Sequence, residues 1–166
     1  MRNEEVIVRN AKTDDLDILY EIEKKTFPPV ERAAKETIAE RMSAYPDCFL
    51  VAEKDGEIAG FINGCKTDSP FICDDMFHNI AEQHKEGENI AVCSLNVAPE
   101  YQKQGIAAEL MNHYIDFAKT NGYKKVILTC KTHLIHYYEK FGFINSGISE
   151  STHGGAQWYN MNLNLK

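Results

Sequence analysis

Apolar residues recur along this chain with two different periods, and the period distinguishes the expected helices from the expected strands. Spacings of four, four and three residues predict a helix after Gly105, whose buried face would be formed by Ile106, Leu110, Tyr114 and Phe117. Similar spacings predict helices over residues 14–25, 31–44 and 132–141. Proline or glycine stands shortly after each of these segments, as expected where a helix ends.

Short runs of β-branched, aromatic and other apolar residues predict the strands. They cover residues 6–9, 48–53, 57–65, 90–97, 126–130, 143–149 and 157–165. Asp55-Gly56 is a two-residue hairpin signal, so the strands on either side of it should be antiparallel neighbours. The run 90–97 is almost entirely apolar, which predicts burial on both faces. Residues 66–88 show little periodicity, and we expect a long loop there with one short helix over 74–84.

The expected order of elements is β-α-α-β-β-β-α-β-α-β-β, an α/β arrangement without an internal repeat or an interdomain linker. A chain of 166 residues is long enough to bury a substantial core. We therefore expect residues 1–166 to form a single domain.

The stretch from Ser94 to Ala108 combines the end of an apolar strand, a tight turn and the start of a helix. A helix N-terminus presents unpaired N–H groups and a partial positive charge, which suits a phosphate group. Gly105 has no Cβ and Ala107 carries only a methyl group, so a ligand could approach the backbone closely. Taken alone, the same residues could also form an ordinary strand-to-helix turn.

Composition and charge narrow the classes of partner. The formal charge is −7 and no basic patch with interleaved aromatic residues occurs, which argues against nucleic acid. Neither the first residues nor any later stretch resembles a signal peptide or a membrane span. Five cysteines without CxxC spacing predict reduced thiols in a cytoplasmic protein, with no disulfide framework and no metal site.

Two motifs and their separation give the chain a family resemblance. Gln102-Lys103-Gln104-Gly105-Ile106-Ala107 matches the (Arg/Gln)-x-x-Gly-x-(Gly/Ala) turn of the GNAT superfamily of N-acetyltransferases, and residues 137–143 match its Y-x-x-x-G-F signature. Within that superfamily, residues 94–97, 128–130 and 134–138 most closely resemble the arylalkylamine (serotonin) N-acetyltransferases. The resemblance implies the GNAT fold, a mixed and mostly antiparallel central sheet flanked by helices.

The resemblance also implies acetyl-CoA as cosubstrate and no metal. Backbone N–H groups in the turn would hold the pyrophosphate, and backbone groups of Leu95 and Val97 would pair with the pantetheine arm like an added strand. The turn residues concerned are Gln102, Gln104, Gly105, Ile106 and Ala107.

The reaction implied is transfer of acetyl to a primary amine of a small aralkyl- or alkylamine, by direct attack without an acyl-enzyme. Tyr138 stands where the family places the acid that protonates the leaving thiolate, although it could also be a core aromatic residue four positions after Leu134. An alkylamine with a pKa of about 10 is only about one part in a thousand neutral at pH 7, a deficit of roughly 4 kcal/mol. A base or a desolvating cavity must offset that deficit.

The base is where the sequence departs from its relatives. Serotonin N-acetyltransferases have histidines at the positions of Ala91 and Cys93, and many other GNAT enzymes have a glutamate at the position of Ala91. Alanine cannot act as a base, and we expect Cys93 to be a buried core residue. Glu31 and His153 could instead face the amine, or both could be solvent-exposed polar residues.

The substrate side of the cavity would include Phe27 and Pro28, which lie where the resembling enzymes build it. Phe71, Phe77, Asp74 and Asp75 could add an apolar wall with an acidic mouth, or could belong to a disordered loop. Two alternatives remain open: an acetyltransferase for a protein N-terminus or lysine, and a degenerate domain that senses acyl-CoA without turnover. The sequence is also compatible with a homodimer.

Overall fold

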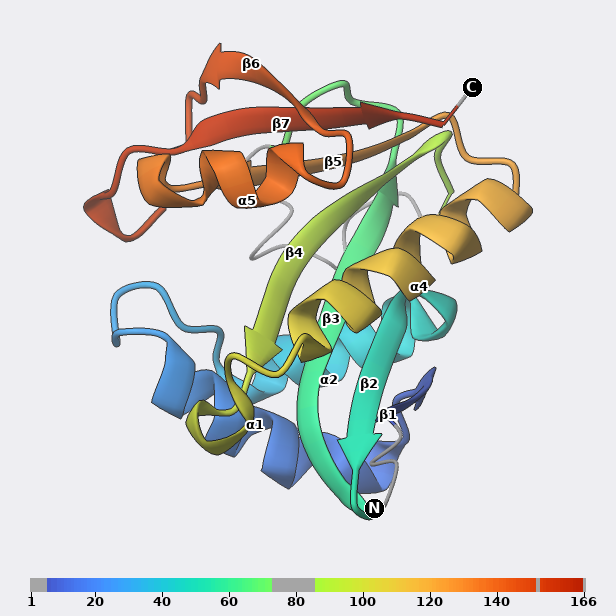
Figure 1. The fold of residues 1–166 in the computed structure, drawn as a ribbon, viewed down its shortest axis with the longest axis vertical. Helices are drawn as coiled ribbons and strands as arrows, with labels where there is room; N and C mark the ends of the chain where they lie inside the picture. The colour runs from blue at the N-terminus through green and yellow to red at the C-terminus, as the bar shows by residue number, and fades with distance from the viewer. Residues whose placement is uncertain (1–5, 73–85, 152, 166) are drawn as a thin grey trace.

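The computed structural model describes residues 6–72, 86–151 and 153–165. These residues form a seven-stranded sheet with the spatial order β1-β2-β3-β4-β5-β7-β6 (Figure 1). All neighbouring strands are antiparallel except β4 and β5, which are parallel. The strands are β1 (Val6–Asn10), β2 (Phe49–Lys54), β3 (Glu57–Thr67), β4 (Asn89–Val97), β5 (Lys125–Cys130), β6 (Ile144–Ile148) and β7 (Tyr159–Asn164). The expected mixed, mostly antiparallel sheet is thereby confirmed.

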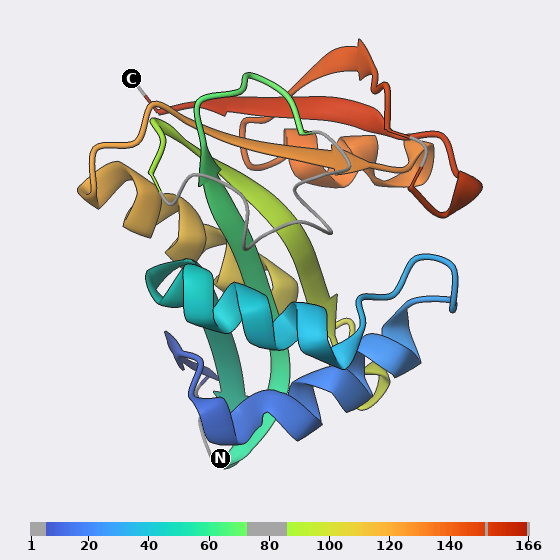
Figure 2. The same ribbon diagram turned by 180° about the vertical axis from the view of Figure 1, so that it is seen from behind.

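Helices cover both faces of the sheet. They are α1 (Leu16–Thr26), α2 (Lys35–Ala44), α4 (Ile106–Thr120) and α5 (Ile135–Glu139). The long helix α4 crosses the front of the sheet in Figure 1, and α1 and α2 cover the opposite face in Figure 2. Short 3-10 turns lead into or out of these elements: η1 (Thr13–Asp15), η2 (Pro46–Cys48), η4 (Pro99–Tyr101), η5 (Thr132–Leu134) and η6 (His153–Gly155).

A hydrophobic core lies on each side of the sheet. On one side, α4 contributes the apolar residues that its spacing predicts, among them Ile106, Leu110 and Tyr114, all fully buried. On the other side, Leu19 and Ile22 of α1 and Ile38 of α2 pack with the stacked rings of β2 and β3. The two cores hold the central strands rigidly, so the site can be built on their ends.

The sheet opens between β4 and β5. Parallel pairing covers only three positions, from Asn89 with Lys125 to Ala91 with Ile127. Strand β4 nevertheless continues to Val97 and stays paired with β3, with a register shift beside Asn63 and Gly64. Figure 1 shows β4 turning away from β5 beyond the paired segment. Among the described residues, the second half of β4 therefore has an edge that no neighbouring strand covers.

Most element boundaries agree with the sequence prediction to within a few residues, and two differences have physical causes. Helix α2 begins at Lys35 rather than at residue 31, because the Ala33 N–H bonds the Glu23 carboxylate and Ala34 is extended. Strand β4 is buried on both faces only in its first half, because β5 leaves it afterwards. The predicted helix over 74–84, with Asp74, Asp75 and Phe77, lies outside the described residues.

The Asp15 carboxylate fixes the start of the first helix. The Asp15 carboxylate accepts hydrogen bonds from the Lys12 N–H (2.7 Å) and from the Arg9 guanidinium (2.8 Å and 3.2 Å). The bond from Arg9 is the main reason that the pKa of Asp15 lies below its usual value. A carboxyl group whose pKa is lowered by folding stabilises the fold at pH values above its unfolded-state pKa. This stabilisation is lost as the pH falls through the folded-state pKa.

Asp15→Asn should therefore lower the free energy of unfolding by about 1–3 kcal/mol at pH 7, because hydrogen bonds to a charged group are lost. The difference from the unmodified chain should shrink as the pH falls below 3.8, the ordinary aspartate value, since the carboxylate is then protonated. Urea unfolding followed by circular dichroism at several pH values measures this. The exposed neighbour Asp14→Asn is the control, and an Asp15→Asn deficit of equal size at all pH values would contradict the assignment.

Candidate active site

A cavity of about 340 Å³ lies where β4 and β5 part. Its wall is formed by the end of α1 and the segment after it, residues 92–95 of β4, residues 128–130 of β5 and side chains from η5, α5 and the segment before β7. Much of the wall is apolar, with Phe27, Val92, Leu95, Leu128 and Leu134. An apolar cavity with a few polar groups is typical of sites for small organic ligands.

The structure brings part of the predicted substrate side to this cavity. Phe27 and Glu31 line it, as does the predicted acid Tyr138. Pro28 is not among the lining residues; its carbonyl accepts hydrogen bonds from the N–H groups of Glu31 and Arg32 (2.9 Å and 3.0 Å) and so turns the chain. His153 begins η6, and its side chain lies outside the described part of the structure.

Tyr138 is held by aromatic contacts on the short helix α5. Its ring meets Tyr137 and Phe143 edge to face, at centroid distances of 5.2 Å and 6.0 Å. Burial raises the pKa of the Tyr138 phenol well above its ordinary value. The phenol therefore stays protonated at neutral pH, which is the form that can donate a proton.

Glu23 is a site residue that the sequence analysis missed. It lies in the wall of the cavity and is only 2% exposed. Its Oε1 accepts a hydrogen bond from Asn96 Nδ2 of β4 (2.6 Å), and its Oε2 accepts one from the Ala33 N–H (2.8 Å). Burial raises the pKa of the Glu23 carboxyl, although these hydrogen bonds and the nearby charges of Arg41 and Arg32 oppose the rise.

The spacing along α1 contained a signal for this residue. Glu23 follows Leu19 by four positions and Ile22 by one, so it belongs to the buried face of the helix. A carboxylate on the apolar face of an amphipathic helix is costly unless it is paired or functional.

Cys93 is not the buried core residue that the sequence analysis expects. It is partly exposed and lines the cavity, next to Ser94, which accepts a hydrogen bond from Asn63 Nδ2 (2.7 Å). A hydrogen bond from the Cys65 thiol lowers the pKa of Cys93 to about 7. Among the described cysteines, Cys48, Cys65, Cys93 and Cys130 are free thiols.

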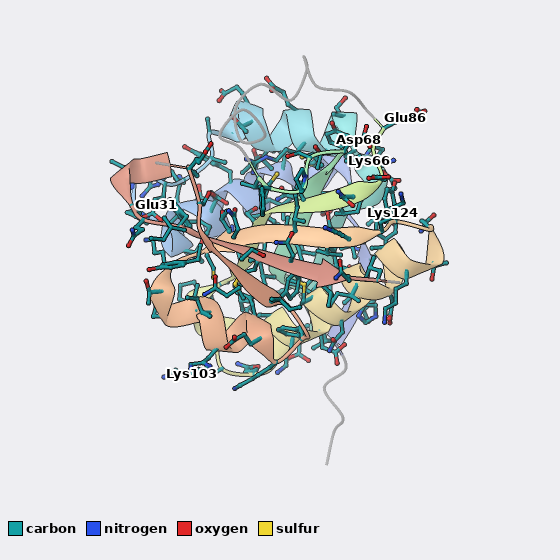
Figure 3. The ribbon with its side chains drawn as sticks, turned by 90° about the horizontal axis from the view of Figure 1, so that it is seen from above. Glu31, Lys66, Asp68, Glu86, Lys103 and Lys124 are labelled. Carbon is teal, nitrogen blue, oxygen red and sulfur yellow. The ribbon has the colours of Figure 1, made fainter. Side chains whose placement is uncertain are left out.

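The cavity mouth is closed on one side by an ion pair. Both oxygens of Glu31 contact Lys131 Nζ, at 2.8 Å and 2.9 Å, and Lys131 also lies over the ring of Trp158 at 5.6 Å from its centroid. A Cβ on Gly154 would come within 2.5 Å of Glu31 Cγ, so the loop before β7 packs directly on Glu31. Glu31 is thus neutralised by a partner 100 residues away in sequence, rather than presented as an unpaired base. From above, Glu31 lies apart from the charged group of Lys66, Asp68, Glu86 and Lys124 (Figure 3).

The turn before α4 has the shape expected of a phosphate cradle. Lys103 and Gly105 both have positive φ, 64° and 82°, and no heavy atom lies within 4 Å of the position that a Gly105 Cβ would occupy. The turn therefore leaves open space over the first N–H groups of α4, which belong to Ile106 and Ala107. Figure 3 shows Lys103 at the periphery of the molecule.

Side chains of the turn tie it to its surroundings. Gln102 Nε2 donates to the carbonyl of Val97 (3.0 Å), and Gln104 Oε1 accepts a hydrogen bond from Lys54 Nζ. The Gln102 N–H donates to the Pro99 carbonyl (3.4 Å), so an anion would be held by N–H groups further along the turn, at the start of α4.

The uncovered edge of β4 leads from this turn to the cavity. The Ala98 N–H bonds Ala59 on β3 (2.8 Å), and backbone groups alternate in direction along a strand. Leu95 and Val97 therefore direct their backbone groups toward the side that β5 has left. An extended ligand arm could add to this edge as a further strand. The predicted acetyl-CoA residues thus lie along the second half of β4 and in the turn that follows it.

Other kinds of site find little support in the residues that the structure describes. Within residues 6–72, 86–151 and 153–165, no three His, Cys, Asp or Glu side chains are grouped so that they could hold a metal ion. None of the helices in those ranges is long and apolar enough to cross a membrane.

Comparison with known proteins agrees with this geometry. A family model described as "Acetyltransferase (GNAT) family" matches residues 16–143. The chain is 30% identical over 118 residues to an uncharacterized N-acetyltransferase of Archaeoglobus fulgidus, across 67% of this chain and 72% of that protein. It is 28% identical over 141 residues to an N-alpha-acetyltransferase of Saccharolobus solfataricus, across 82% and 78% of the two chains.

Similarity also extends to a longer protein and to solved structures. The chain is 24% identical to YhcX of Bacillus subtilis, but the match spans only 27% of that protein's length. The solved structure of yncA from Salmonella typhimurium with its cofactor acetyl-CoA superposes with a TM-score of 0.70 and 16% identity, covering 97% of this chain and 94% of that one.

Proposed function

The chain belongs to the acetyltransferase (GNAT) family and is an acetyl-CoA-dependent N-acetyltransferase, and we propose that its acceptor is the primary amine of a small aralkyl- or alkylamine. The observation that carries the proposal is the cavity between β4 and β5. Its volume of about 340 Å³ is near the lower end of the range for small-molecule sites. Phe27 and Trp158 supply aromatic surface for the apolar part of such an amine. The resemblance of residues 94–97, 128–130 and 134–135 and of Tyr138 to arylalkylamine acetyltransferases supports the same acceptor class.

In this proposal the turn before α4 and the edge of β4 hold acetyl-CoA. Backbone N–H groups of residues 104–107, beside Gln102, would bind the pyrophosphate, and backbone groups of Leu95 and Val97 would pair with the pantetheine arm. Bound there, acetyl-CoA supplies a thioester whose carbonyl carbon an amine can attack. Tyr138 lies in the cavity wall and is the proposed proton donor to the leaving sulfur.

A second acceptor class is favoured by one comparison. The Saccharolobus solfataricus relative is named an N-alpha-acetyltransferase, and the match covers most of both chains. A peptide α-amine is also a primary amine. A peptide would need room beyond the cavity, where the contact between Gly154 and Glu31 and the Lys131 ion pair now narrow the mouth.

An acceptor panel tests the proposal. The protein is incubated with acetyl-CoA and, in separate reactions, phenylethylamine, tryptamine, alkylamines, polyamines and short peptides, and the products are identified by mass spectrometry. Mass detection avoids interference from the protein's own thiols. We expect acetylated phenylethylamine or tryptamine to form fastest. Transfer to peptides alone would replace the proposed acceptor, and binding of acetyl-CoA without transfer to any amine would favour a sensor.

A further inference from the structure

We infer that Glu23 is the group that takes the proton from the acceptor's ammonium before the amine attacks. The inference rests on the proposed function, since it concerns the amine side of the same cavity. Two residues occupy the positions that carry the base in resembling enzymes: Ala91, which cannot act as a base, and Cys93, which shares a hydrogen bond with the Cys65 thiol. The wall of the cavity also offers the carboxyl groups of Glu23 and Glu31.

Geometry separates Glu23 from the other carboxylate of the cavity wall. Glu31 has both oxygens on Lys131 and is packed under Gly154. Glu23 instead accepts one neutral N–H donor on each oxygen, from Asn96 and from Ala33. A carboxylate has about four acceptor positions, so two remain for an ammonium or for a water molecule that bridges to it.

The two donors also fix the orientation of the carboxylate. Ala33 belongs to the segment after α1, and Asn96 belongs to β4, so the group is held between the helix layer and the sheet. Asn96 is 2% exposed, and its amide nitrogen must face Glu23, because its carbonyl oxygen there would repel the carboxylate. Such a rigidly held acceptor meets the positional requirement of a general base.

Burial and nearby charges act in opposite directions on the pKa of Glu23. Arg41 of α2 and Arg32 of the preceding segment favour the carboxylate, whereas burial favours the neutral acid. Burial dominates, so the pKa of Glu23 is raised toward the working range of a base at neutral pH. The other titratable side chains of the wall are Glu31, Cys93, Cys130 and Tyr138, together with Arg32 and Arg41.

The proposed step balances as follows. One proton passes from the ammonium nitrogen to Glu23, directly or through one water molecule. The nitrogen lone pair then forms the bond to the acetyl carbon, and the carbon–sulfur bond breaks with its electron pair on sulfur. Tyr138 gives its phenol proton to that sulfur and regains a proton from the nitrogen, which becomes the amide. Glu23 releases its proton to water after the product leaves.

Glu23→Gln tests the inference, because the glutamine side chain has the same shape as glutamate but cannot accept the proton. Its amide group can still be hydrogen-bonded if the Asn96 side chain rotates and presents its oxygen. With the best amine of the panel, we expect kcat to fall by about 10²–10⁴-fold at pH 7, the usual range for a lost acid or base. The loss should be smaller at high pH and for a weakly basic amine, because in both cases the amine is already neutral and no proton has to be removed before the attack. Acetyl-CoA affinity and the melting temperature should be unchanged or higher. The control is Glu21→Gln, a solvent-exposed carboxylate on the same helix that pairs with Lys24.

Two results would overturn the assignment. One is a Glu23→Gln variant that is folded, binds acetyl-CoA and keeps its activity and pH profile; the other is a loss of equal size at every pH, which indicates a structural role. If Glu23→Gln does not fold, Asn96→Ala provides the test. It removes the hydrogen bond that Asn96 donates to the Glu23 carboxylate, so the pKa of Glu23 should rise and the acidic limb of the kcat/KM profile should move to higher pH. An unmoved limb in folded Asn96→Ala would contradict the inference. Failure of the proposed function itself is distinguishable, because the unmodified enzyme would then acetylate none of the small amines.

Discussion

Tyr138→Phe is expected to lower turnover by about 10²–10⁴-fold while leaving the affinity for acetyl-CoA nearly unchanged. The phenylalanine ring can keep the edge-to-face contacts with Tyr137 and Phe143, so the packing of α5 should survive. Only the hydroxyl that would protonate the leaving sulfur is lost. Steady-state kinetics with a small amine and calorimetric titration with acetyl-CoA measure the two quantities separately.

Tyr137→Phe is the matched control for that experiment. Tyr137 is the neighbouring phenol on the same helix and touches Tyr138, but it is not among the residues lining the cavity. Its hydroxyl should therefore be dispensable for turnover. Equal losses in the two variants, or unchanged turnover in Tyr138→Phe, would remove Tyr138 from the proposed mechanism.

Gly105→Val is expected to weaken acetyl-CoA binding by at least about 10-fold, which corresponds to roughly 1.4 kcal/mol. The substitution has two effects. A β-branched residue is strained at φ 82°, and its side chain would fill the open space over the first turn of α4. That space is where the pyrophosphate is proposed to approach the backbone. Calorimetric titration measures the affinity, and turnover at saturating acetyl-CoA should fall much less.

Gly122→Val is the control that distinguishes backbone strain at a positive φ from loss of the space next to the turn. Gly122 follows the other end of α4, has φ 79° and also has open space at its Cβ position. Both variants should lose a similar amount of stability, of order 1–2 kcal/mol for the left-handed conformation. Only Gly105→Val should lose affinity. Similar affinity losses in both variants would mean that strain in α4, and not access to the turn, controls binding.

Local sequence signals predicted much of the fold because they depend on neighbouring residues. Asp55-Gly56 is an example: both residues have positive φ, 54° and 80°, and the strands on either side pair as expected. The face of α4 is another, since its spacing alone placed Ile106, Leu110 and Tyr114 in the core. The turn 102–105 was recognisable because its small residues and its position between strand and helix are local features.

The features that define the cavity depend on contacts between distant residues. The point where β4 and β5 part is a matter of register between segments that lie more than 30 residues apart, and no local pattern encodes it. Glu31 could not be matched with Lys131 from the sequence for the same reason. Glu23 and Asn96 are separated by 73 positions, so their hydrogen bond was equally hidden. The charge on the apolar face of α1 was the one local sign that Glu23 is unusual.

The most direct test of the account is a competition between acceptors in one reaction. Unmodified protein is mixed with acetyl-CoA and equal concentrations of phenylethylamine and a short peptide with a free N-terminus, and both acetylated products are followed over time by mass spectrometry. We expect acetylated phenylethylamine to form faster than the acetylated peptide, since the cavity between β4 and β5 suits a small amine. Acetylation of the peptide with phenylethylamine left untouched would contradict it, as would the absence of both products.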